Sequence, residues 1–125
     1  MTDSSQIKEK CGSFDSNKTV TVDREWVANE LSMISNFSEK HSVPVWIDQW
    51  GLRASAVGGD AVLDQYMTDI LSEFDQRKFH WTYWIWRRTK SWGEGGYAIE
   101  RQAEDGSYSL FELALKHISK YLGKK

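Results

Sequence analysis

Two stretches of the sequence end in residues whose side chains could bind a carbohydrate. The first runs from Val43 to Gly51, where an apolar run is followed by Gln49 and Trp50. The second runs from Phe79 to Trp86 and is dense in aromatic and β-branched side chains. An aromatic ring offers a flat apolar face on which the C–H face of a sugar ring can stack. Four tryptophans are candidates for such stacking, Trp84 first and then Trp50, Trp86 and Trp92, and composition alone does not separate this use from packing.

Packing is the other use of these tryptophans, because the chain holds seven of them among 125 residues. The indole is large and fills the space between helices and strands in many cores. We expect Trp26, Trp46 and Trp81 to pack between the helix and strand layers.

Composition argues against several other functions. The formal net charge is -2, which gives no basic face for nucleic acid, and no apolar run is long enough to predict a transmembrane helix. The first twenty residues are polar, so no signal peptide is expected in this chain. Cys11 stands alone, and the three histidines lack a metal-ligand spacing, so we predict no metal site and no cofactor. These histidines are His41, His80 and His117.

The elements that must position the aromatic residues follow from periodicity. Residues 1–22 are predicted to be a polar tail or loop remnant, and residues 23–125 to form one module. Asp23 is predicted to cap a helix that ends near His41, since Pro44 disfavours helix in the residue before it. Asp60 is predicted to cap a second helix, and a capping box formed by Ser109 and Glu112 to start a third. The apolar stripes of the first and last helices are Val27, Leu31, Ile34 and Phe37, and Phe111, Ala114, Leu115, Ile118 and Leu122.

The order of elements is therefore helix, strand, helix, strand, helix. Strands separated by helices need crossover connections, so the two strands are expected to pair in parallel. This order predicts an α/β fold that is part of a (β/α)8 barrel. A whole barrel takes about 250 residues, so this chain would hold roughly a quarter of one and a tail.

Three segments resemble the C-terminal part of the cellulase-like glycoside hydrolases, family 5 and its clan. Pro44 to Gly51 resembles the seventh barrel strand, which in that family ends in Glu-Phe/Trp-Gly. His80 to Trp86 is similar to the eighth strand, whose terminal Trp lines a sugar subsite. Gly96 to Ile99, followed by Asp105-Gly106, resembles the loop before the final helix. The resemblance implies a β-linked glycan as ligand and, in most family members, secretion.

The same resemblance argues against catalysis. It places Gln49 at the position of the nucleophilic Glu, and an amide has no negative charge with which to attack the anomeric carbon. The Asn-Glu-Pro context that carries the family's acid/base does not occur in the sequence. Strand alternation is expected to point Asp48 away from the face that Gln49 uses. Glu94, in a loop after the second strand, is the other candidate carboxylate.

A two-stranded parallel sheet covered on one side would leave an apolar face and open strand edges bare. We therefore expect a homo-oligomer or a completing chain. Three functions remain open: a carbohydrate-related barrel piece that is inactive as written, a part of an active retaining β-glycosidase whose Gln49 traps substrate or whose other half comes from another chain, and a protein-interaction module.

Overall fold

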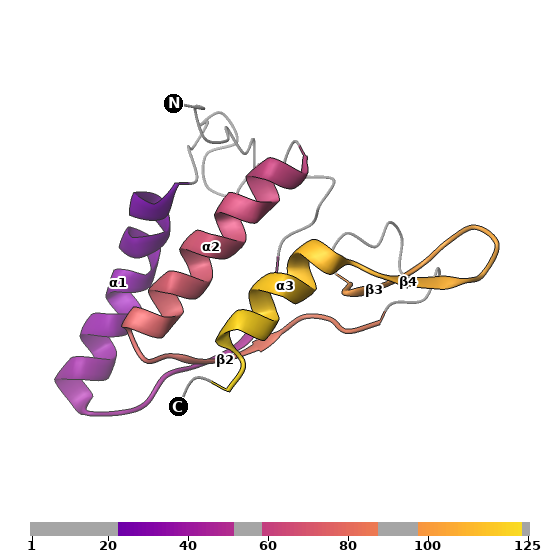
Figure 1. The fold of residues 1–125 in the computed structure, drawn as a ribbon. Coiled ribbons are helices and arrows are strands. Elements are labelled where there is room, and N and C mark those ends of the chain that lie inside the picture. The colour runs from indigo at the N-terminus through magenta and orange to yellow at the C-terminus, as the bar shows by residue number, and fades with distance from the viewer. Residues whose placement is uncertain (1–22, 52–58, 88–97, 124–125) are drawn as a thin grey trace, which may run out of the picture.

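The structure is a computed structural model that describes residues 23–51, 59–87 and 98–123. The predicted tail, residues 1–22, lies outside the described residues. The predicted order of helix, strand, helix, strand, helix is confirmed, and two short strands stand before the last helix (Figure 1). In chain order the elements are α1 (Arg24–His41), β1 (Trp46–Trp50), α2 (Asp60–Gln76), β2 (His80–Tyr83), β3 (Glu100–Gln102), β4 (Tyr108–Leu110) and α3 (Glu112–Tyr121).

Strands β1 and β2 form a parallel two-stranded sheet, as their connection through α2 requires. The other two strands, β3 and β4, form an antiparallel hairpin. The turn of this hairpin contains the predicted Asp105-Gly106 pair, and Gly106 adopts a φ of 87°, which only glycine adopts without strain. A parallel bridge between Arg87 and Glu100 connects the hairpin to the segment that follows β2.

All three helices lie on the same side of the β1–β2 sheet, with α2 between α1 and α3 (Figure 1). The core lies between the sheet and these helices, and its most buried large side chains are Phe74, Met67 and Leu71 of α2. Each helix turns an apolar stripe toward the sheet, which is the arrangement expected of β/α units. The other members of the core are Val27, Leu31, Trp50, Leu63, Ile70, Phe79, Ile99, Ala114 and Ile118.

Helix α1 begins and ends where the sequence predicts. The Asp23 side chain accepts a hydrogen bond of 2.8 Å from the backbone N–H of Trp26, which satisfies one free amide of the first turn. Ser42 follows the helix in the left-handed conformation with φ of 53°. Val27 and Leu31 are buried as predicted. Phe37 is 58% exposed, so the predicted stripe leaves the core before the helix ends.

Replacing Asp23 by Ala is expected to lower the free energy of unfolding by about 1 kcal/mol, because the Trp26 amide loses its acceptor. Urea denaturation followed by circular dichroism measures this change. Asp23→Asn keeps an acceptor at the same position and should remain close to the original stability. Equal losses in both variants would contradict a capping role.

The predicted caps of α2 and α3 are wrong. Gly59 occupies the N-cap of α2, and Asp60 is already the first helical residue. Ser109 belongs to β4, where it pairs with Arg101, so it is not free to cap a helix. Helix α3 starts at Glu112 with no side-chain cap hydrogen bond. The backbone of Ser109 is paired with β3 in the hairpin, so it is not available for the predicted capping box.

Polar pairs on α2 connect the helix layer. The buried carboxylate of Glu73 accepts a hydrogen bond of 3.0 Å from the Arg24 Nε of α1 and also pairs with Arg77. On the other side of α2, Asp64 lies 2.7 Å from the Nε2 of His117 in α3. The hydrogen bond to His117 holds the pKa of Asp64 below its usual value. These contacts fix α1 and α3 against α2, and so fix the sheet beneath them.

Candidate functional site

The register of β1 on β2 contains one extra residue in β1. Three steps along β1 match two steps along β2, which is the pattern of a β-bulge. Asp48 and Gln49 therefore share the position opposite Thr82. The matched pairs on either side are Ile47 with Trp81 and Trp50 with Tyr83.

This bulge changes which side chains share a face. Ile47 and Trp50 both pack against the core although they are three residues apart, which regular alternation would not allow. Asp48 and Gln49 between them are both exposed. The expectation that alternation separates Asp48 from Gln49 is therefore wrong, because the bulge interrupts the alternation. The Thr82 hydroxyl donates a hydrogen bond to the backbone carbonyl of Asp48 and holds the bulge in place.

Trp50 is a packing residue beneath this edge of the sheet. Trp50 is only 8% exposed. Three aromatic rings meet it edge-on, those of Phe74, Trp81 and Tyr83, at centroid distances of 5.1 to 5.4 Å. Its indole N–H has no hydrogen-bond partner among the described residues. Direct contact of Trp50 with a sugar stays a prediction.

A shallow hollow of about 220 Å³ lies at the carboxyl ends of β1 and β2. Its lining is Gln49, Trp50, Gly51 and Trp84. The backbone N–H of Trp84 donates to the carbonyl of Trp50 at 3.0 Å, so the two strand ends are tied at this point. The residue Trp84 is 39% exposed, and its peptide bond to Ile85 is cis. The structure therefore brings Gln49 and Trp84, predicted from separate segments, to one site.

The remaining predicted tryptophans lie elsewhere. Trp86 is exposed but does not line the hollow, and Trp92 lies outside the described residues, as does Glu94. Trp26 and Trp81 are partly buried against the core, as expected of packing residues. Trp46 is 67% exposed, so its predicted packing role is wrong. The reason is that no described helix or strand covers the sheet face on which Trp46 lies.

The β3–β4 hairpin brings charged residues beside the strand ends. The guanidinium of Arg87 binds Glu100 at 2.5 Å and lies 4.5 Å from the centre of the Tyr108 ring. The hydrogen bond from Arg87 lowers the pKa of Glu100. Arg101 stacks on Phe111 at 3.5 Å, and burial lowers the pKa of its guanidinium. Of this hairpin the sequence analysis singles out only the Asp105-Gly106 pair, as part of a loop, because strands of three residues are too short to show a period.

Other kinds of site find little support in the described ranges. No group of three or more His, Cys, Asp or Glu side chains there is placed to hold a metal ion. None of the described helices combines the length and apolar character that a membrane span requires.

No protein-family model and no curated protein matches the sequence. Solved structures do match the fold. The chain is similar to Thermotoga maritima Cel5A in complex with cellobiose, with a TM-score of 0.59 and 17% identity over 90% of this chain and 30% of that one. It is also similar to the cellulose synthase subunit Z of Clostridioides difficile, with a TM-score of 0.55 and 14% identity over 86% of this chain and 30% of the other. A complex of XacCel5A with cellopentaose matches with a TM-score of 0.52 and 15% identity, over 84% and 31% of the two chains.

These likenesses define the fold. The chain is an α/β module with the architecture of part of a cellulase-like (β/α)8 barrel. It spans about 30% of the length of the Cel5A structures that it matches.

Proposed function

We propose that this chain is the carbohydrate-binding C-terminal part of a cellulase-like barrel, and that it does not hydrolyse glycosidic bonds with the residues it carries. The hollow lined by Gln49 and Trp84 at the carboxyl ends of β1 and β2 carries this proposal. Active sites of (β/α)8 barrels are built at that end of the strands, whatever the chemistry. The order of the elements supports their assignment as the sixth helix to the eighth helix.

A β-linked glycan is the ligand that fits these residues. The exposed part of the Trp84 indole supplies an apolar face for a sugar ring. The Gln49 amide supplies both a donor and an acceptor for sugar hydroxyls. Solved neighbours contain cellobiose, mannotriose and cellopentaose. We propose that a glucan or mannan chain of this kind crosses the hollow.

The proposed lack of hydrolysis is supported by the side chains that line the hollow. Retaining glycosidases use two carboxyl groups about 5–5.5 Å apart. The described lining of the hollow includes Gln49 and no carboxylate. Asp48 is exposed beside it, but it is not part of the lining. We therefore assign binding, and not cleavage, to the chain as it stands.

Replacing Trp84 by Ala is expected to weaken binding of cellopentaose about tenfold, equal to about 1.4 kcal/mol, because the stacking face is lost. Isothermal titration calorimetry measures the change. Trp46→Ala is the matched control, since Trp46 is a more exposed tryptophan of the same sheet and lies at its other end. Similar losses in both variants, or none in Trp84→Ala, would contradict a sugar site at the hollow.

The exposed sheet face supports a second candidate function, that of an interaction module without a sugar role. Trp46 and His80 lie together on this face, with ring centroids 6.4 Å apart. A module of that kind would lose association, and not glycan binding, when its exposed aromatic residues are replaced. The Trp84 and Trp46 variants therefore distinguish the two functions.

A further inference from the structure

The hollow at the carboxyl ends of β1 and β2 is too small to hold a whole glycan chain. Its volume is about 220 Å³, whereas pockets that enclose a small-molecule ligand measure about 300–1,000 Å³. One sugar unit can stack on Trp84 there, and the other units of an oligosaccharide must lie on the surface beside the hollow. That surface therefore decides how long a glycan the site can hold.

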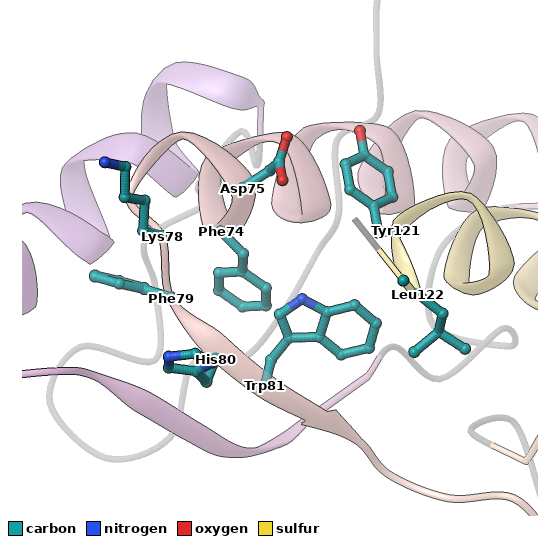
Figure 2. Close-up of a pocket in the computed structure, with 9 residues that line it drawn as sticks. Phe74, Asp75, Lys78, Phe79, His80, Trp81, Tyr121 and Leu122 are labelled. Atoms are coloured by element: carbon teal, nitrogen blue, oxygen red, sulfur yellow. The ribbon is translucent and has the colours of Figure 1, made fainter. Parts of the chain in front are cut away.

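A larger depression lies at the other end of the sheet and is not placed to take up these units. It has a volume of about 590 Å³ and lies between the C-terminal ends of α2 and α3 and the start of β2. Figure 2 shows the Trp81 indole in its middle. Its lining includes His80, the first residue of β2. A glycan that leaves the hollow starts at the opposite end of this strand, so the surface that it meets first is the segment that follows β2.

The segment that follows β2 presents a further exposed tryptophan. Trp86 follows Trp84 by two residues, so their Cα atoms lie no more than about 7 Å apart. Trp86 is 55% exposed and does not belong to the core cluster. Holding an exposed side chain in one orientation costs conformational entropy, so a fixed orientation requires specific contacts.

Glu100 of β3 holds Trp86 through both the backbone and the side chain. The backbone N–H of Glu100 donates to the carbonyl of Trp86 at 2.7 Å. The Glu100 carboxylate accepts a hydrogen bond from the Trp86 side chain, in which the indole N–H is the only donor. Because this N–H lies at the edge of the indole, the hydrogen bond fixes the ring without covering its faces.

Arg87 and Tyr108 fix the Glu100 carboxylate in turn. The Arg87 Nε donates to this carboxylate at 2.5 Å, and the guanidinium lies 4.5 Å from the centre of the Tyr108 ring. The Glu100 side chain is only 16% exposed, so it is held beneath more exposed neighbours. Tyr108 pairs with Gln102 in the hairpin, which connects the whole set to β3 and β4. We call Arg87, Glu100 and Tyr108 the Glu100 network.

We propose that the Glu100 network holds the Trp86 ring as a second stacking platform, and that the site thereby selects β-linked glycans longer than a disaccharide. This proposal rests on the sugar site assigned to the hollow. One sugar unit stacks on Trp84, and a unit farther along the same glycan stacks on Trp86. Glu100 is a positioning residue, because it acts through Trp86.

Isothermal titration calorimetry of the full 125-residue chain with cellobiose and with cellopentaose tests the proposal. Trp86→Ala should weaken cellopentaose binding about tenfold and change cellobiose binding less than about twofold, because only the longer glycan reaches the second platform. Glu100→Ala should weaken cellopentaose binding about threefold, because the indole must then be ordered on binding. Glu100→Gln keeps a hydrogen-bond acceptor for the indole and should recover most of this loss.

The control is Trp46→Ala, which removes an exposed tryptophan at the other end of the sheet. It should change neither affinity, and circular dichroism should show that all variants fold. Equal losses for both glycans in Trp86→Ala, or no loss for either, would overturn the proposal. Unchanged cellopentaose binding by Glu100→Ala would overturn the positioning role.

The same titrations separate this proposal from the proposed function. If the unaltered chain binds neither glycan, both are overturned. If Trp84→Ala weakens cellopentaose binding and Trp86→Ala does not, the sugar site at the hollow stands and the second platform is overturned.

Discussion

Replacing Gln49 by Glu in the completed barrel is expected to raise the rate of β-glucan cleavage at least about a thousandfold. The change places a negative charge at the edge of the hollow that Gln49 and Trp84 line, and under the proposed assignment of Gln49 this is where a retaining enzyme needs its nucleophile. A thousandfold corresponds to about 4 kcal/mol of transition-state stabilisation. The assay combines the chain with a segment that supplies the remaining barrel units and the acid/base, and measures release of reducing sugar.

Two further variants decide what the glutamate does. Gln49→Met removes the amide without adding charge and should stay as inactive as the original chain. Gln49→Asp adds the charge on a side chain one methylene shorter and should recover only part of the rate, because nucleophilic attack requires close approach. No gain with Glu would remove Gln49 from the nucleophile position. Cleavage by the unaltered complex would instead favour an active glycosidase completed by another chain.

The largest effect on stability is expected for Phe74→Ala. Phe74 is 1% exposed and contacts the rings of Trp50 and Phe79 at centroid distances of 5.4 and 6.4 Å. Truncation of such a residue costs about 3–5 kcal/mol, through lost burial and the cavity that remains. A small domain has about 5–15 kcal/mol in all, so we expect a large loss of folded protein at 37 °C. Thermal and urea denaturation measure it.

Phe37→Ala is the matched control, because it makes the same truncation on an exposed phenylalanine of α1. We expect a change within about 0.5 kcal/mol. The Phe74 variant should also weaken glycan binding, because Trp50 would lose one of the rings that hold it below the hollow. A Phe74 variant as stable as the Phe37 variant would show that the core does not depend on α2 in the way described.

The part of the fold that the sequence predicts is the part fixed by local rules. The cap at Asp23, the end of α1 before Pro44 and the parallel pairing of β1 with β2 all follow from residue types and connection length. The hairpin does not follow from them, because three-residue strands have no readable period. For this reason the predicted capping role of Ser109 is wrong. Its side chain is of the type that caps helices, but its backbone is paired within β4.

The candidate site was predictable to a smaller extent. The resemblance indicated both Gln49 and Trp84, and the structure places them around one hollow. The exposure of Asp48 and the burial of Trp50 depend on a single extra residue in β1. No residue type in this strand predicts a β-bulge. The exposure of Trp46 depends on which elements cover the sheet, which is a property of the assembly and not of the local sequence.

Because the core lies on only one face of the β1–β2 sheet, it also predicts the order in which parts of a growing chain fold. The described core joins the sheet to the helices of the same module, and these elements follow one another along the sequence. They can therefore form as one cooperative unit before the inner wall of a barrel exists. The sheet face that carries Trp46 would be covered last during folding and exposed first during unfolding. A ribosome-bound chain that ends after α3 should accordingly already protect Met67 and Leu71 while Trp46 stays accessible to solvent.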